Sequence, residues 1–246
     1  MTEIPSVPLL GYRFVTLPKE QLAEQLLCTD HPLRVYTPNP EMLFRASKDR
    51  QLKNILQNAD LLLPDGVGIT LTARLIGSPL PHRLPGIDVA ECLLAQAARH
   101  GESVYLLGSA EHVAERAADR LQEAYRGLKI VGTHHGYFDR SEGSEENQAL
   151  CQRLRDLSPT LLFVCLGCPA QEKWIEENLP HLPSVRIAMG LGGALDVWSG
   201  TLHRAPRLFR TIGLEWLWRC LLQPKRLLRL GSIPVFLLSA LREKHS

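Results

Sequence analysis

The chain has 246 residues, of which 45% are hydrophobic and 22% charged, and its formal net charge is +2 at pH 7. This composition is typical of a globular protein and excludes the disordered and fibrous classes. The first residues contain no cationic segment followed by an apolar run, and no stretch of about 18 uninterrupted apolar residues occurs. We therefore expect no secretory signal, no membrane-spanning helix and a cytoplasmic location.

The charge is unevenly distributed along the chain. Residues 201–246 hold nine basic and two acidic side chains, a net charge of +7, whereas the other 200 residues carry −5. A basic segment on an acidic body indicates an anionic partner, which can be a nucleic acid, a phosphorylated substrate or an anionic lipid. The alternative is a solvated helix face.

From residue 33 onward, short apolar runs alternate with amphipathic helical patterns. Strands are predicted at residues 33–37, 60–64, 103–108, 128–134, 160–167 and 185–190. Helices are predicted around residues 52–59, 87–97 and 113–124. This alternation predicts an α/β fold with a mainly parallel sheet over residues 1–200, followed by a basic appendage over residues 201–246.

Small and polar residues follow the ends of these strands. Ligands of parallel sheets bind there, and small residues let a ligand approach the backbone. Helix N-termini at the same edge favour phosphate. The sequence therefore predicts a nucleotide or sugar-phosphate site built from residues 37–41, 65–68, 108–109, 134–138, 167–172 and 190–196.

Asp65 follows an apolar strand and precedes Gly66 and Gly68. One interpretation is a helix N-cap, a position that Asp favours. A capping Asp needs no glycines after it, however, so the two glycines indicate that something packs closely against the backbone. A carboxylate at such a position is suited to act as a general base.

Other motifs predict less. Gly190 and Gly192 begin a dinucleotide fingerprint, but Leu195 stands where its third glycine belongs, so we do not expect NAD. Adjacent residues of a strand point to opposite faces, so His134 and His135 are not expected to share a metal ion. No second pair of ligands accompanies the cysteines described next, so no zinc site is expected either.

Cys165 and Cys168 form a C-x-x-C motif between a strand and a helix. A thiol–disulfide oxidoreductase would place its reactive pair there, because a helix N-terminus lowers the pKa of a thiol. This activity is an alternative function. The remaining cysteines are predicted to be small core residues of a reducing compartment: Cys28, Cys92, Cys151 and Cys220.

The C-terminal segment interleaves arginines and lysines with Leu and Trp from Arg204 onward. This pattern is typical of an interfacial helix on anionic lipid headgroups, and it favours lipid over nucleic acid. The alternatives are a helix that packs on the body and a non-enzymatic membrane adaptor built on this segment.

The combination of motifs resembles the bacterial WecG/TagA/CpsF family of glycosyltransferases from about Tyr36 to the C-terminus. The matching motifs are TPNPEM (37–42), LLPDGVGI (62–69), RLPGIDV (83–89), LLGS (106–109), HHGYFD (134–139), GCPAQE (167–172), MGLGGALDVWSGTLHRAP (189–206) and GLEWLWRCLLQPKR (213–226). The resemblance implies a Rossmann-like body with a helical, membrane-associating appendage at the C-terminus. It also implies inverting transfer of N-acetylmannosamine or its uronic acid from a UDP-sugar to the 4-hydroxyl of GlcNAc on undecaprenyl diphosphate.

The resemblance also assigns roles to single residues. Asp65 becomes the general base and Arg219 the cation that stabilises the departing UDP. Asp196 is expected to hydrogen-bond the uridine. The substrate- and nucleotide-binding residues are then Thr37, Asn39, Arg83, Gly108, Ser109, Tyr137, Gly167, Pro169, Gln171, Glu172, Gly192, Gly193, Asp196 and Arg204.

The expected partners are a UDP-sugar, a polyprenyl-diphosphate-linked GlcNAc and an anionic membrane surface, without nucleic acid. Because no D-x-D motif follows a strand, we expect transfer without a metal or other cofactor, the UDP-sugar being a co-substrate. The expected location is peripheral, on the inner face of the cell membrane, in surface polysaccharide synthesis. The donor sugar and association between copies of the chain stay open.

Overall fold

The computed structural model describes residues 4–141, 143–206, 209, 215 and 217–218. The chain forms two compact units. The first comprises Lys19–Tyr36 and Ile87–His203, and the second comprises the segment up to Pro18, Thr37–Gly86 and the described residues from Arg204 onward. The boundary predicted at residue 200 stays a prediction, although the first unit ends close to it.

Five parallel strands form the sheet of the first unit. Their order across the sheet is β3-β8-β7-β5-β6, and every neighbouring pair is parallel. β5, β7 and β8 are almost entirely buried, which explains their unbroken apolar sequences. The predicted α/β fold with a mainly parallel sheet is thus confirmed. The strands are β3 (Leu33–Tyr36), β5 (Ser103–Gly108), β6 (Lys129–His134), β7 (Leu161–Cys165) and β8 (Ile187–Gly190).

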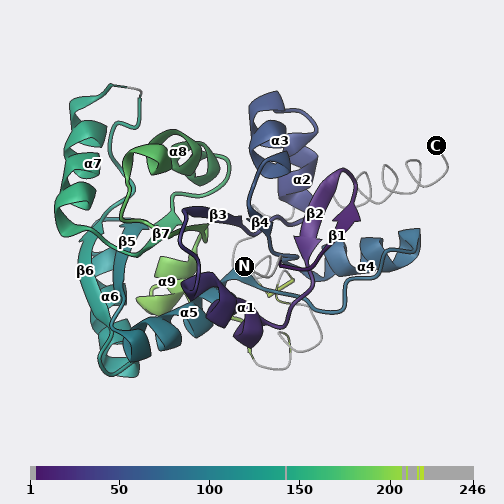
Figure 1. Ribbon diagram of the computed structural model, residues 1–246, viewed down its shortest axis with the longest axis horizontal. Helices are drawn as coiled ribbons and strands as arrows, with labels where there is room; N and C mark the ends of the chain where they lie inside the picture. The colour runs from purple at the N-terminus through teal and green to yellow at the C-terminus, as the bar shows by residue number, and fades with distance from the viewer. Residues whose placement is uncertain (1–3, 142, 207–208, 210–214, 216, 219–246) are drawn as a thin grey trace. The chain divides into compact units, whose positions relative to one another are not determined.

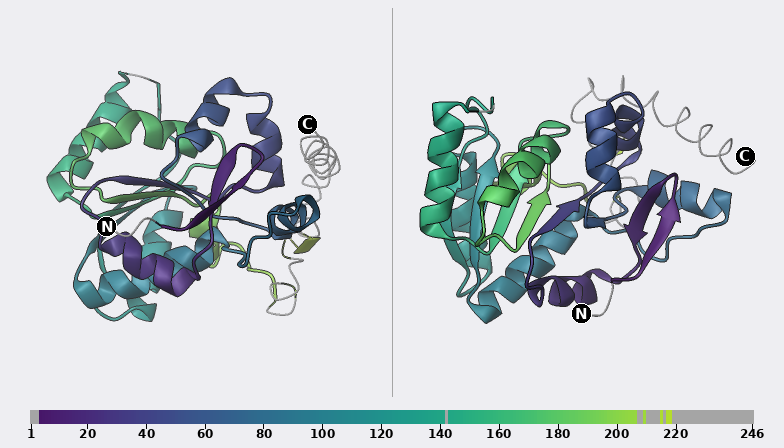
Figure 2. Two further views of the ribbon diagram at one scale, coloured as in Figure 1. Left: turned by 45° about the vertical axis from the view of Figure 1, so that its right-hand side comes forward. Right: turned by 45° about the horizontal axis from the view of Figure 1, so that its top comes forward.

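Helices cover both faces of this sheet (Figures 1 and 2). α7 (Glu145–Leu157) and α8 (Ala170–Asn178) lie on one face, whereas α5 (Gly86–His100) and α6 (Val113–Ala124) lie on the other. Because α6 follows β5 and α8 follows β7, the chain leaves these two neighbouring strands toward opposite faces. Such a reversal marks the place where open parallel sheets bind ligands. We call the carboxyl ends of β5 and β7 the switch point. The first unit also contains α1 (Lys19–Leu27), η1 (Leu179–His181) and α9 (Ala194–Trp198).

The second unit begins with a β-hairpin that the sequence pattern did not predict. β1 (Ser6–Leu9) pairs antiparallel with β2 (Tyr12–Val15) through a turn with positive φ at Leu10 and Gly11. The usual sequence signal for such a turn is Asn-Gly. This turn has Leu10 in place of the asparagine, so the signal is absent. β2 also runs parallel to β4. The remaining elements are α2 (Pro40–Ala46), α3 (Arg50–Gln57), β4 (Leu61–Leu62) and α4 (Val67–Ile76).

The other predicted elements agree with the structure except in length. The strand predicted at residues 60–64 is shorter in the structure, where β4 comprises only Leu61–Leu62. Pro64 does not extend it, because proline cannot donate a ladder hydrogen bond. The strand predicted at residues 160–167 ends at Cys165. The helices predicted around residues 52–59, 87–97 and 113–124 are confirmed as α3, α5 and α6.

Most of the predicted appendage lies outside the described residues, and this includes Arg219 and Cys220. In the part that is described, Nε of Arg204 lies 3.8 Å from Oε1 of Glu215. Among the helices of the described residues, none combines the length and the apolar character that crossing a bilayer requires.

Candidate functional site

The loops that follow β5, β6, β7 and β8 meet at the switch point. Ser109 N–H donates to the Cys165 carbonyl (3.2 Å), and Gly136 N–H donates to the Ser109 carbonyl (2.8 Å). Leu191 N–H donates to the Val164 carbonyl (2.9 Å). Backbone hydrogen bonds therefore join four segments that the sequence shows only as separate strand ends.

Ser109 and Asp196 connect the first and the last of these loops. The Ser109 hydroxyl donates a short hydrogen bond to Oδ1 of Asp196, and both side chains are half-buried. Asp196 lies in the first turn of α9, close to the exposed Gly193. An ionised carboxylate accepts several hydrogen bonds, so its second oxygen can also receive an N–H group of a ligand.

Glycine at the end of β5 is required by the protein itself. Gly108 has φ +134°, and a Cβ there would lie 2.4 Å from the Cys165 carbonyl oxygen. At Gly136, which lies in the predicted segment 134–138, a Cβ would come within 3.2 Å of Ser109 N. In front of Gly167 and Gly192, by contrast, a Cβ would meet no atom within 4 Å. Among the predicted glycines at the switch point, these two are the ones with space in front of the backbone.

Gln171 and Glu172 lie in the interior, with 2% and 0% of their surface exposed. Oε1 of Gln171 accepts hydrogen bonds from Gly167 N–H (3.2 Å) and Gly192 N–H (2.9 Å), and its Nε2 donates to Oε1 of Glu172 (2.7 Å). The Gln171 amide thus ties the loops after β7 and β8 together. A Cβ at Gly190 would lie 2.9 Å from Nε2 of Gln171, so close packing inside the protein explains the glycine at this position. The predicted contact of Gln171 and Glu172 with the nucleotide stays a prediction.

The loop after β6 carries two histidines and an exposed tyrosine. The expectation that His134 and His135 point to opposite faces is wrong, since their ring centroids lie 4.7 Å apart. β6 ends at His134, so the alternation of a strand no longer governs His135. Within the described residues, no group of three or more His, Cys, Asp or Glu side chains is placed to hold a metal ion. Tyr137 is 78% exposed and presents its ring to solvent near the end of β6.

Of the remaining predicted residues, Pro169 is the N-cap of α8 in the first unit. Loops of the second unit hold Thr37, Asn39, Asp65 and Arg83. Asp65 N–H lies 3.4 Å from the Pro38 carbonyl, and Leu84 N–H donates to the Pro64 carbonyl (3.0 Å). These contacts bring the loop that starts at Thr37 and the segment around Arg83 to the Asp65 backbone. Thr37 is buried, whereas Asp65, Arg83 and Asn39 are half-buried. Oδ1 of Asn39 accepts a hydrogen bond from Met42 N–H (2.9 Å) and so caps α2.

Asp65 does not cap the helix that follows it. The N-cap of α4 is Gly66, with φ +87° and no side-chain capping bond, so the N-cap interpretation is wrong. The close packing predicted at both glycines is confirmed only at Gly68, where a Cβ would lie 2.5 Å from Cγ of the Pro40 ring. At Gly66 a Cβ would meet no atom within 4 Å, so the prediction is wrong there. The general-base role of Asp65 stays a prediction.

The Cys165 thiol does not have the properties that redox chemistry needs. Cys165 is buried, and this burial raises the pKa of its thiol to about 12. The helix N-terminus expected to lower that pKa does not compensate for the lost hydration. This environment argues against the oxidoreductase alternative, because the first thiol of the motif stays protonated at neutral pH. The prediction that the other cysteines lie in the core is also wrong for Cys28, which is exposed, and for Cys92, which is half-buried; Cys151 is buried.

This difference predicts selective alkylation. With a pKa of about 12, roughly one Cys165 thiol in ten thousand is ionised at pH 8. Iodoacetamide applied to the folded protein at pH 8 is expected to modify Cys28 and to leave Cys165 unmodified, as peptide mass spectrometry will show. Rapid modification of Cys165 before unfolding would contradict this environment.

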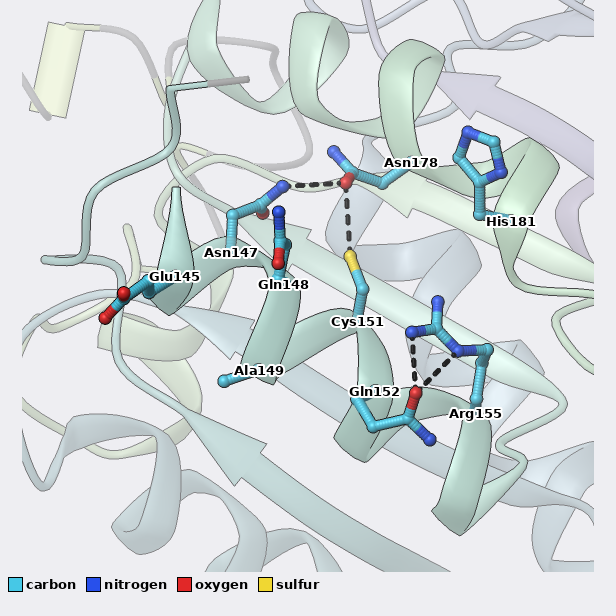
Figure 3. Close-up of a pocket in the computed structure, with 9 residues that line it drawn as sticks. All are labelled: Glu145, Asn147, Gln148, Ala149, Cys151, Gln152, Arg155, Asn178 and His181. Carbon is cyan, nitrogen blue, oxygen red and sulfur yellow. Dashed lines mark hydrogen bonds between the residues drawn. The ribbon is translucent and has the colours of Figure 1, made fainter. Parts of the chain in front are cut away.

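A hollow of about 550 Å³ lies away from these loops, lined by residues of α7, Asn178 and His181 (Figure 3). Asn147 donates to Oδ1 of Asn178 (2.9 Å), and the Cys151 thiol donates to the same oxygen (3.1 Å). Trp174 Nε1–H in turn donates to Oδ1 of Asn147 (2.7 Å). These bonds fasten α7 to α8, and none of the predicted site residues lines this hollow.

Comparison with known proteins identifies a family for nearly the whole chain. The model of the "Glycosyl transferase WecG/TagA/CpsF family" matches residues 7–246. A curated protein of Bacillus spizizenii is 34% identical over 212 residues, which cover 86% of this chain and 80% of the relative. A curated protein of Staphylococcus aureus is 32% identical over 244 residues, covering 97% and 93% of the two chains. Both relatives are named N-acetylglucosaminyldiphosphoundecaprenol N-acetyl-beta-D-mannosaminyltransferase.

Proposed function

Because the chain belongs to the WecG/TagA/CpsF family of glycosyl transferases, we propose that it transfers N-acetylmannosamine, or the corresponding uronic acid, from a UDP-sugar to the 4-hydroxyl of GlcNAc on undecaprenyl diphosphate. The acceptor follows the names of the curated relatives. The transferred sugar also follows these names, whereas the strand ends support the nucleotide part of the donor.

The observation that carries the proposal is the Ser109–Asp196 pair at the switch point. The pair supports binding of the nucleotide there, because the Asp196 carboxylate can accept the imide N–H of uracil while Ser109 fixes its orientation. The space in front of Gly167 and Gly192 supports close approach of the rest of the nucleotide. The exposed ring of Tyr137 can stack on a base.

Asp65 is the proposed general base. Its carboxylate takes the proton of the acceptor 4-hydroxyl while that oxygen forms a bond to the anomeric carbon of the donor. The bond from the anomeric carbon to the diphosphate breaks in the same displacement, and UDP leaves with the electron pair. One displacement from the opposite side inverts the anomeric configuration.

Cationic side chains are proposed to stabilise the departing diphosphate. Arg219 has this role in the proposal, with Arg83 and Arg204 as further substrate-binding residues. The N–H groups of Gly167 and Gly192 already donate to Gln171. Binding of the phosphates therefore depends more on side-chain cations. The proposed reaction uses no metal, and transfer in excess EDTA at the rate seen with Mg²⁺ would support this.

The proposed location is peripheral, on the inner face of the cell membrane, where a lipid-linked acceptor is found. Basic and Trp/Leu-rich residues from Arg204 onward support it, because such segments bind anionic headgroups.

A donor panel tests the proposed reaction. The purified full chain is incubated with a GlcNAc-diphospholipid acceptor and, separately, with UDP-N-acetylmannosamine, its uronic acid, UDP-GlcNAc and UDP-glucose. Transfer from one of the two mannosamine donors, with a β-linked product in the NMR spectrum, is expected. The proposal would be contradicted if a protein that binds UDP transferred sugar from neither mannosamine donor to the acceptor.

A further inference from the structure

The outward face of α4 combines exposed leucines with an arginine. Leu71 is 46% and Leu75 is 48% exposed, and these two residues lie one helical turn apart. Arg74 lies on the same face and is also exposed. Only four large apolar side chains are exposed among the described residues, and two of them are on this helix. We call Leu71, Arg74 and Leu75 the α4 face (α4 is labelled in Figure 1).

The opposite side of α4 is anchored in the second unit. Ile69, Thr72 and Ala73 are buried, and the Thr72 hydroxyl donates to the Gly68 carbonyl (2.8 Å). The helix ends at Gly77, which has the left-handed conformation typical of a C-cap. Because the buried side fixes this helix, Leu71 and Leu75 stay on its exposed side. They leave water only when a partner covers them.

The charge around this face selects the class of partner. Residues 66–87 contain no Asp or Glu but do contain Arg74, His82 and Arg83. A helix with exposed leucines, in a stretch of chain whose charged groups are all basic, is complementary to an anionic bilayer, whose headgroups attract arginine while its interface accepts leucine. The same stretch begins directly after Asp65, the proposed base for a lipid-linked acceptor.

We propose that the α4 face is a membrane contact in the body of the protein, in which Leu71 and Leu75 enter the interface of an anionic bilayer and Arg74 meets its headgroups. Its residues do not belong to the basic C-terminal segment. It rests on the proposed function for its purpose, which is to keep Asp65 next to the bilayer that carries the acceptor. The contact itself requires no substrate.

Vesicle flotation of the full chain tests the contact. The variants are Leu71→Ser/Leu75→Ser and, as the matched control, Leu157→Ser, which removes an exposed leucine from α7 in the first unit. With vesicles containing phosphatidylglycerol, the double variant is expected to partition roughly tenfold more weakly than the wild type. The control is expected to partition as the wild type does. Equal partitioning of both variants would overturn the proposal.

A third variant separates headgroup attraction from leucine insertion. Arg74→Gln is expected to weaken partitioning roughly fivefold on vesicles with phosphatidylglycerol and to change nothing on pure phosphatidylcholine. An equal effect on both vesicles would overturn the headgroup contact.

Measurements without vesicles identify other occupants of the face. If the double variant sediments as a smaller species than the wild type, a second copy covers the leucines. If residues 219–246 become more sensitive to trypsin in the double variant, that segment covers them. Either result would overturn the proposal. Transfer to a water-soluble short-chain acceptor reports on the proposed function independently, and the double variant is expected to retain it.

Discussion

Replacing Asp65 with asparagine is expected to lower the rate of sugar transfer by about 10²–10⁴-fold. The asparagine amide cannot take the proton of the acceptor hydroxyl. Because it has the size of the aspartate side chain, the loop around residue 65 is expected to keep its conformation. The measurement is the initial rate of UDP release with saturating donor and acceptor. Binding of UDP is expected to stay within twofold of the wild type, since the proposed nucleotide residues are on other loops.

Asp60→Asn is the matched control for this substitution. Asp60 is an exposed carboxylate that precedes β4, whereas Asp65 follows the same strand. This variant is expected to transfer sugar at the wild-type rate. A near-normal rate for Asp65→Asn would remove the base assignment, and an equal loss in both variants would point to a general effect of charge.

Gly108→Ala is expected to have the largest effect on the stability of the first unit. Its φ of +134° lies in a region that only glycine occupies readily, and the added Cβ would lie 2.4 Å from the Cys165 carbonyl oxygen. Backbone strain and overpacking each cost about 1–3 kcal/mol, so the free energy of unfolding is expected to fall by about 2–6 kcal/mol. Urea denaturation followed by circular dichroism measures this loss.

Gly101→Ala separates the collision from the strain. Gly101 precedes the same strand and has φ +71°, but a Cβ there would meet only the flexible end of Lys129, at 3.3 Å. Its loss is expected to be about 1–2 kcal/mol, the usual cost of a left-handed residue. Equal losses at both glycines would show that the contact between the ends of β5 and β7 does not restrict residue 108.

Local sequence predicts the first unit well because its strands are buried on both faces. Runs such as LLFVC in β7 are apolar at every position, and the helix patterns between them are strongly amphipathic. Those two signals also place Gly108, Ser109, Gly167 and Asp196 at one edge of the sheet. The N-terminal hairpin gives no comparable signal, because Leu10 occupies a turn position that usually carries Asn or Gly.

Burial of the polar residues at this edge could not be predicted in the same way. Whether Gln171 faces a ligand or the interior depends on Gly167 and Gly192, which come from two different loops. The high pKa of Cys165 likewise arises from burial that local sequence does not reveal. The close packing predicted at Gly68 was correct, but its partner, Pro40, belongs to a distant segment. Such tertiary contacts decide which strand-end residues remain available to a substrate.

Titration calorimetry with UDP tests most directly whether the nucleotide binds at the switch point while Asp65 serves as the base. Asp196→Ala and Ser109→Ala are expected to weaken UDP binding by at least about tenfold. The first variant removes the carboxylate that accepts the uracil N–H, and the second removes the hydroxyl that orients this carboxylate. Asp65→Asn is expected to bind UDP as the wild type does. Thermal unfolding of each variant verifies that it is folded. Unchanged UDP affinity in Asp196→Ala, together with a large loss in Asp65→Asn, would contradict a nucleotide site at the switch point.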